Sequence, residues 1–141
     1  MILADVNVLL SAFRPDAEHY KPSRKWLDAC TAGQSAFGVS AQVLSSVIRV
    51  ATHRKIFKTP SILTEVIDYC NKLLSHPNAR IVAPGDRHWE IFTGLCIAAN
   101  AKENLVPDAW FAALAIEHDC EWITFDRDYA RFPGLKWRVP E

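Results

Sequence analysis

The sequence lacks the features that mark membrane proteins, secreted proteins and zinc-thiolate proteins. No apolar stretch reaches membrane-spanning length, and Asp5 interrupts the apolar run near the N-terminus, so we expect neither a spanning helix nor a signal peptide. The four cysteines form no CxxC pair, and the five histidines show no HxH or HxxxH spacing. We therefore expect a soluble protein of the reducing cytoplasm, with no zinc site.

The chain also lacks net charge, since 16 basic residues balance 16 acidic ones. This balance argues against a protein that coats nucleic acid through overall basicity, although it permits a basic rim around an acidic pocket. Half of the 141 residues are hydrophobic, and there is no repeat, low-complexity tract or long linker. These properties predict a folded chain with one domain over residues 1–141.

Short apolar runs alternate with segments that have the apolar periodicity of helices. Such alternation predicts right-handed crossovers in a three-layer α/β/α sandwich, with a mostly parallel central sheet of four to five strands. We expect strands at residues 2–4, 36–39, 80–83, 121–125 and 135–139, and helices at residues 6–13, 22–33, 41–52, 60–74, 87–101 and 108–118.

Four aspartates stand at the boundaries between expected strands and helices. Asp5 follows the first strand, Asp108 opens a helix behind Pro107, and Asp126 and Asp128 follow the fourth strand. Each of them alone is compatible with a helix cap or a charged turn. In an open α/β sheet, however, these boundaries converge on one crevice, where repelling carboxylates are usually neutralised by a hard cation. Together they predict a site for Mg²⁺ or Mn²⁺.

The order of the motifs along nearly the whole chain resembles the PIN-domain ribonucleases. More narrowly, it is similar to the VapC-type toxins of type II VapBC toxin–antitoxin systems. The segments that carry the resemblance are Asp5-Val6-Asn7-Val8-Leu9-Leu10, Arg49-Val50-Ala51-Thr52-His53, Pro107-Asp108-Ala109 and Thr124-Phe125-Asp126-Arg127-Asp128-Tyr129.

The resemblance implies an endoribonuclease that hydrolyses RNA phosphodiester bonds with Mg²⁺ or Mn²⁺. It further implies a homodimer that a VapB-type antitoxin holds inactive. By position, Asp5, Asp108 and Asp126 correspond to the catalytic, metal-binding acids. Asn7 corresponds to a polar residue that supports the first aspartate, and Asp128 is a possible further support.

Ser46 departs from the pattern, because many PIN nucleases carry a glutamate at this position, three residues before an arginine like Arg49. A serine cannot supply the negative charge, although it can hold a metal-bound water. One alternative is therefore a catalytically weakened PIN-fold binding module. Another is an aspartyl-phosphate phosphohydrolase that uses Asp5, but such enzymes generally need a second acid where this chain has Asn7.

The strongest local concentration of positive charge follows the helix that contains Ser46. Arg49, Arg54 and Lys55 are candidates for contact with RNA phosphates beside the acidic pocket. The alternative is a solvated helix end, where cations interact favourably with the helix dipole.

Overall fold

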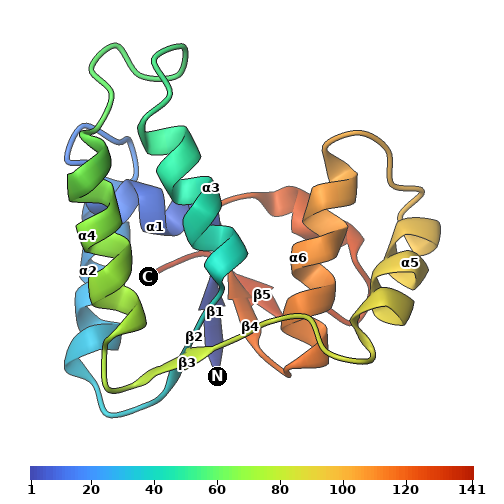
Figure 1. Ribbon diagram of the computed structural model, residues 1–141. Helices are drawn as coiled ribbons and strands as arrows, with labels where there is room; N and C mark the ends of the chain where they lie inside the picture. Colours follow the sequence, from blue (N-terminus) through green and yellow to red (C-terminus); the bar gives the residue numbers. More distant parts are fainter.

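The computed structural model describes residues 1–141 and contains a twisted sheet of five parallel strands (Figure 1). The strand order is β3-β2-β1-β4-β5, and every neighbouring pair is parallel. The strands are β1 (Ile2–Ala4), β2 (Phe37–Val39), β3 (Ala79–Ile81), β4 (Glu121–Ile123) and β5 (Trp137–Arg138). The central β1 is flanked by β2 and β4, so Asp5 at its end lies in the middle of one sheet edge.

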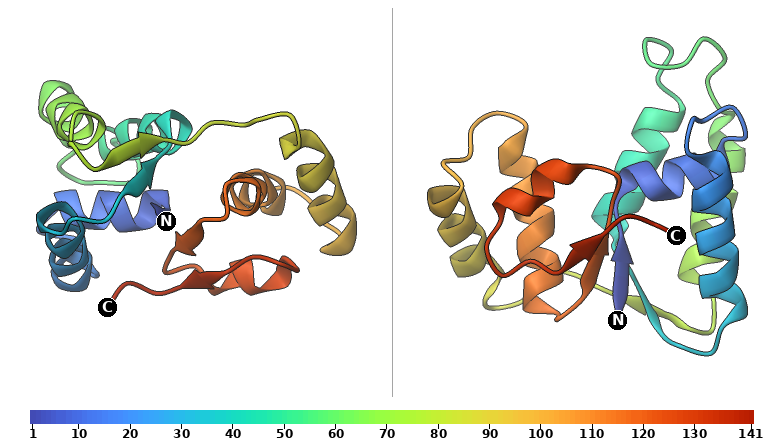
Figure 2. Two further views of the ribbon diagram at one scale, coloured as in Figure 1. Left: turned by 90° about the horizontal axis from the view of Figure 1, so that it is seen from below. Right: turned by 180° about the vertical axis from the view of Figure 1, so that it is seen from behind.

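Six α-helices cover the two faces of the sheet and give the predicted three layers (Figure 2). The first four lie on one side and the last two on the other, as right-handed crossovers require for this strand order. The helices are α1 (Val6–Phe13), α2 (Tyr20–Ala32), α3 (Ala41–Ala51), α4 (Leu63–Leu74), α5 (His88–Ala98) and α6 (Leu105–Glu117). A 3₁₀ helix, η1 (Arg127–Arg131), connects β4 to the segment before β5. The α/β/α fold class is confirmed.

The core lies between the sheet and the helices on both of its faces. Leu3 and Trp122 from adjacent strands are almost completely buried, and the rings of Phe111 and Trp122 stack with centroids 5.7 Å apart. The alanine run 112–115 of α6 is interrupted only by Leu114 and is fully buried. These small side chains let α6 approach the sheet closely, which fixes the position of the helix that carries Asp108.

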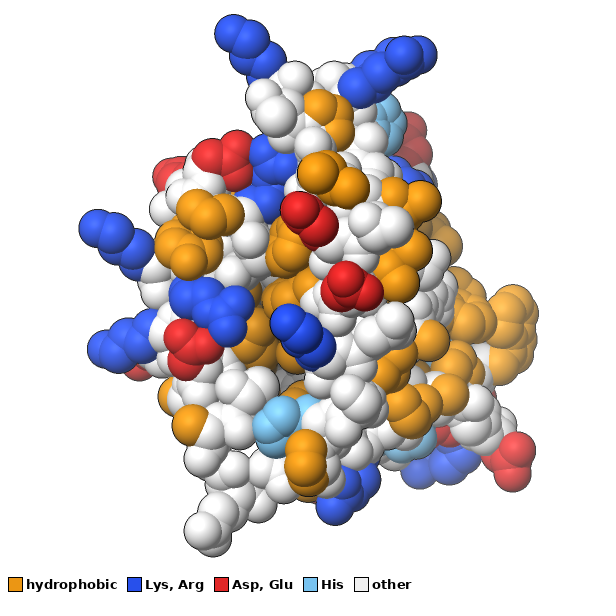
Figure 3. All heavy atoms as spheres, turned by 60° about the vertical axis from the view of Figure 1, so that its left-hand side comes forward, with side chains coloured by type: hydrophobic (Ala, Val, Ile, Leu, Met, Phe, Trp, Pro, Cys, Tyr) orange, Lys and Arg blue, Asp and Glu red, His pale blue; other side chains and the backbone are white.

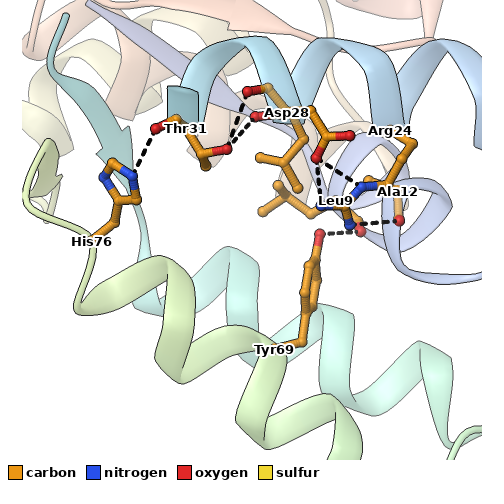
Figure 4. A network of polar contacts seen from close by, with 8 residues as sticks. Leu9, Ala12, Arg24, Asp28, Thr31, Tyr69 and His76 are labelled. Atoms are coloured by element: carbon orange, nitrogen blue, oxygen red, sulfur yellow. Dashed lines mark hydrogen bonds and ion pairs between the residues drawn. The ribbon is translucent and has the colours of Figure 1, made fainter. Parts of the chain in front are cut away.

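Side-chain hydrogen bonds fasten α4 to α1 and α2 (Figure 4). The Tyr69 hydroxyl donates to the Leu9 carbonyl over 2.7 Å, and His76 Nε2 lies 2.9 Å from the Thr31 carbonyl. Arg24 of α2 donates to the Ala12 carbonyl of α1 at 3.4 Å and pairs with Asp28 on its own helix at 2.6 Å. The α3 helix packs against α1 and α4, so the first four helices form one layer.

Some element boundaries differ from the expected ones, chiefly at helix starts. Helices α2 and α6 begin two residues before Pro22 and Pro107 respectively. Proline is tolerated in a first turn because its missing N–H would have no partner there. The α4 helix begins at Leu63, later than expected, and η1 has no counterpart among the expected elements. None of the helices combines the length and apolar character needed to cross a membrane.

Candidate active site

Asp5 is the buried centre of a polar cluster at the end of β1. It is the N-cap of α1, and its Oδ1 accepts a 2.6 Å hydrogen bond from the Val6 backbone N–H. Its Oδ2 accepts from the Thr124 hydroxyl at 2.7 Å and from the Asn7 amide at 3.3 Å. No basic side chain forms an ion pair with Asp5. The carboxylate is therefore fixed in orientation while its charge stays uncompensated.

Asn7 and Thr124 connect the start of α1 to the chain segment that follows β4. Asn7 donates to Thr124 Oγ1 at 3.2 Å, and its own carbonyl oxygen accepts from the Phe125 N–H at 3.2 Å. Thr124 Oγ1 also accepts the Asp126 N–H at 3.0 Å. This network places Asp126 beside Asp5, although the two are far apart in sequence.

Asp108 reaches the same cluster from the first turn of α6. It is partly exposed, and its Oδ1 accepts a 3.3 Å hydrogen bond from the Tyr129 hydroxyl. Tyr129 belongs to η1 and is buried, with its ring packed against Trp122 and Phe132. The aromatic packing holds the hydroxyl in place and so restrains the orientation of the Asp108 carboxylate.

Burial and mutual repulsion both disfavour the ionised forms of these acids. Burial raises the pKa of Asp5 to about 6, and the charges of Asp108 and Asp126 add to this effect against the lowering by the hydrogen bonds from Thr124 and Val6. The pKa of Asp108 also rises to about 6, through burial and then through the charge of Asp126, with a smaller contribution from Asp128. The carboxylates thus lie close enough to repel one another.

Asp126 and Asp128 have different environments. Asp126 caps η1, and its Oδ1 accepts the Asp128 N–H at 2.9 Å. The Asp128 side chain is exposed and lies 4.0 Å from Arg131, an ion pair of the weak surface kind. The charged-turn interpretation therefore describes Asp128, whereas Asp126 belongs to the acidic cluster.

One face of α3, in the other layer, is directed toward α6, the helix that carries Asp108. Gln42 Oε1 accepts a 2.6 Å hydrogen bond from Trp110 Nε1, so this face of α3 is directed toward α6. Ser46 and Arg49 follow at the fourth and seventh positions after Gln42 and share its helix face. Arg49 is exposed and Ser46 partly buried. Arg54 and Lys55 lie farther away, in the exposed loop after α3.

The cluster suits a hydrated hard cation better than a metal enclosed by protein ligands. No three histidine, cysteine or acidic side chains are grouped tightly enough to form a complete cage. Mg²⁺, however, usually retains several waters and takes only one or two carboxylates directly. Asp5 and Asp108 supply uncompensated carboxylates with raised pKa values. A divalent ion between them would relieve their repulsion, so the donor set fits Mg²⁺ or Mn²⁺.

Two residues of the cluster were missed in the sequence. By pattern alone, Thr124 resembles part of an apolar strand, and Tyr129 resembles the end of a charged turn. The available signal was weak in both cases: a hydroxyl that ends a buried run two residues before an acid, and one aromatic residue within Asp126–Arg131. Their importance depends on contacts over 119 and 21 residues of separation, respectively.

A family model for the PIN domain matches residues 2–135, which is nearly the entire chain. The chain belongs to the PIN domain family. Among curated proteins, the PIN chain is 38% identical to Ribonuclease VapC31 and 37% identical to Ribonuclease VapC25, both from Mycobacterium tuberculosis. Each alignment covers 136 residues, or 96% of both partners.

Solved structures show the same fold at much lower sequence identity. The PIN chain matches a chain of VapBC2 from Rickettsia felis, bound to a promoter DNA fragment, with a TM-score of 0.71, 15% identity and full coverage of both chains. It matches VapC20 of M. tuberculosis, described as a Sarcin-Ricin loop cleaving toxin, with a TM-score of 0.66 and 14% identity. That match covers 96% of this chain and 98% of VapC20. At such identities the comparison establishes the fold alone.

Proposed function

We propose that this PIN protein is a metal-dependent endoribonuclease and the toxin of a type II toxin–antitoxin pair. The observation that carries the proposal is the cluster of Asp5, Asp108 and Asp126, whose carboxylates repel one another and form no ion pair with a basic side chain. Relatives that align over almost the full chain are named ribonucleases, which supports RNA as the substrate.

In this proposal, Asp5, Asp108 and Asp126 would hold Mg²⁺ or Mn²⁺. The ion would supply charge neutralisation for the phosphodiester and would lower the pKa of water. The protein contributes orientation: Thr124 and Asn7 fix Asp5, and Tyr129 restrains Asp108. The reaction is hydrolysis of an RNA phosphodiester by water, without a covalent intermediate.

The residue two positions after Asp5 does not suit the alternative role of Asp5 as a phosphorylated nucleophile. Such enzymes generally need a second acid there, and this chain has Asn7, whose amide donates to Asp5 Oδ2 and to Thr124 Oγ1. An amide cannot act as the acid–base group of that reaction. We therefore do not favour an aspartyl-phosphate mechanism.

The antitoxin partner is proposed to bind the groove between α2 and α4. Apolar side chains of Phe13, Leu27 and Leu73 line it together with charged ones such as Arg24 and Asp68. Figure 3 looks onto this side of the molecule and shows hydrophobic atoms between charged ones. A groove lined by both apolar and charged side chains suits an amphipathic helix. Several structural neighbours are toxin–antitoxin complexes, which supports such a partner.

The proposal is tested by measuring Mn²⁺ binding calorimetrically and RNA cleavage separately, with the parent protein and the Asp108→Asn variant. We expect the parent to bind Mn²⁺ and to cleave RNA in Mg²⁺ or Mn²⁺ but not in EDTA. The variant should fold, bind Mn²⁺ weakly and leave RNA intact. If the parent neither binds Mn²⁺ nor cleaves varied RNAs, the weakened binding module is correct. A variant as active as the parent would exclude Asp108 from the reaction.

A further inference from the structure

The segment 52–61 between α3 and α4 is an ordered loop, which we call the basic loop; it rises above the rest of the molecule in Figure 1. Its base is closed by the Ser61 N–H, which donates to the Ala51 carbonyl at 2.8 Å. Inside it, the N–H groups of Ile56 and Phe57 both donate to the His53 carbonyl at 3.0 Å. The loop is therefore folded back on itself and does not depend on a partner for its shape.

Arg14, at the end of α1, anchors the basic loop from below. Its guanidinium is almost completely buried and donates to Ser61 Oγ at 2.8 Å and to the Thr59 carbonyl at 3.0 Å. It also lies over the Phe57 ring, 3.7 Å from the centroid. Asp16 binds the remaining guanidinium edge at 2.7 and 3.0 Å. One planar cation thus joins α1 to three residues of the loop.

The basic loop presents three cations and no acid. Arg54, Lys55 and Lys58 are exposed, and none of them takes part in an ion pair. Figure 3 shows Lys and Arg side chains extending into solvent from the top of the molecule, where the loop lies. They also lie beyond the end of α3 at Ala51, outside its last turn. The helix-end interpretation therefore does not account for them.

We propose that the basic loop binds the phosphate backbone of RNA, and that Arg14 is the positioning residue that keeps the loop in its binding shape. The inference rests on the proposed function, because it assumes an RNA substrate for the acidic pocket. A loop that is already ordered loses less conformational entropy when it binds. Arg14 has no free donor edge for RNA, since its partners are Ser61, Thr59 and Asp16.

The contact part of the proposal is tested by RNA binding in EDTA, where cleavage does not interfere. A labelled single-stranded RNA is titrated with the parent, with a triple alanine variant of Arg54, Lys55 and Lys58, and with a charge-matched control. The control replaces three exposed cations of α2 and α4 that form no ion pair, namely Lys21, Lys25 and Lys72.

The loop variant should bind about tenfold or more weakly at moderate salt, and its dependence of log Kd on log salt should be shallower by up to about 2. The control should bind like the parent. Equal losses in both variants would show that only net charge matters and would overturn the proposal, as would unchanged binding by the loop variant. Failure of the nuclease assignment is recognised separately, by binding without cleavage when Mn²⁺ replaces EDTA.

The positioning part is tested with Arg14→Lys, which keeps the charge but loses the fork-shaped donor set, and with the milder Ser61→Ala. Amide hydrogen exchange should become faster in residues 53–60, and RNA affinity should fall several-fold with an unchanged salt dependence. An unchanged exchange rate in both variants would overturn this role. Faster exchange with unchanged RNA affinity would also overturn it, because the shape of the loop would then not govern binding.

Discussion

Replacing Asp5 by Asn should make the metal-free protein more stable at neutral pH while it destroys the proposed site. The substitution keeps the size of the side chain but removes a charge that is only 6% exposed. Burial, and then repulsion from Asp108 and Asp126, raises the pKa of Asp5 from 3.8 to about 6. A pKa raised that far means that ionised Asp5 lowers the free energy of unfolding by about 3 kcal/mol.

The sign of the pH dependence follows from proton binding. Between pH 4 and 6 the folded protein holds a proton on Asp5 that the unfolded chain has already lost. The free energy of unfolding of the parent therefore falls as pH rises through this window, and the penalty is complete above about pH 6.5. The Asp5→Asn variant carries no such penalty. Its advantage over the parent should grow by about 2–3 kcal/mol between pH 4 and pH 7.5.

The substituted amide also introduces a cost, because its N–H₂ group faces donors from Thr124 and Asn7 that now bind a carboxylate oxygen. One lost hydrogen bond costs about 1 kcal/mol. This cost is nearly independent of pH, so it cancels when the two pH values are compared. The comparison thus isolates the charge of Asp5.

The assay is urea unfolding followed by tryptophan fluorescence at pH 4 and 7.5 in EDTA, with Asp68→Asn, an exposed acid of α4, as the charge-matched control. The control should follow the parent at both pH values. Adding Mn²⁺ at pH 7.5 should stabilise the parent and the control but not the Asp5→Asn variant. Parallel stability curves for the parent and Asp5→Asn, or equal stabilisation of both by Mn²⁺, would refute the reasoning.

Three further substitutions test the neighbours of Asp5. Tyr129→Phe should lower Mn²⁺ affinity by about 10- to 100-fold, measured by calorimetry, with little loss of stability, because it removes only the hydroxyl that restrains Asp108. Thr124→Val should cost about 1–3 kcal/mol at pH 7.5, and less at pH 4, where Asp5 is protonated; urea titrations at both pH values check this. Ser46→Glu adds a carboxylate to the α3 face directed toward α6. It should tighten Mn²⁺ binding about tenfold and lower metal-free stability at pH 7.5. Unchanged Mn²⁺ affinity would show that residue 46 lies outside the site.

The fold could be predicted from the sequence because its signals are local. Continuous apolar runs such as Ile2–Ala4, helix caps such as Ser40 and the alternation of strands with helices need no knowledge of distant contacts. The expected start of α6 at Asp108 was wrong, because the helix begins at Leu105 and Pro107 lies within its first turn, where a missing N–H is tolerated.

The candidate site could be predicted only in part. The sheet-edge rule predicts that Asp5, Asp108 and Asp126 lie near one another, because strand ends and helix starts meet at one edge for any sequence with this topology. In the structure the charges of Asp108 and Asp126 act on Asp5, although the roles of the three acids stay a prediction. The groups that orient the acids could not be found in this way. Thr124 and Tyr129 act through hydrogen bonds whose partners are defined only by the folded register of β4 and η1.

The acidic cluster destabilises the folded protein, and this destabilisation is itself an argument for function. Asp5 and Asp108 lie at helix N-termini, where the helix dipole partly offsets their charge, yet their pKa values remain near 6. Asparagine at position 5 would retain a cap without the electrostatic cost. A chain that needed only a stable fold would gain from such a replacement. The carboxylates make physical sense when a divalent cation supplies the missing positive charge, and the pH dependence of the metal-free protein measures how large that missing contribution is.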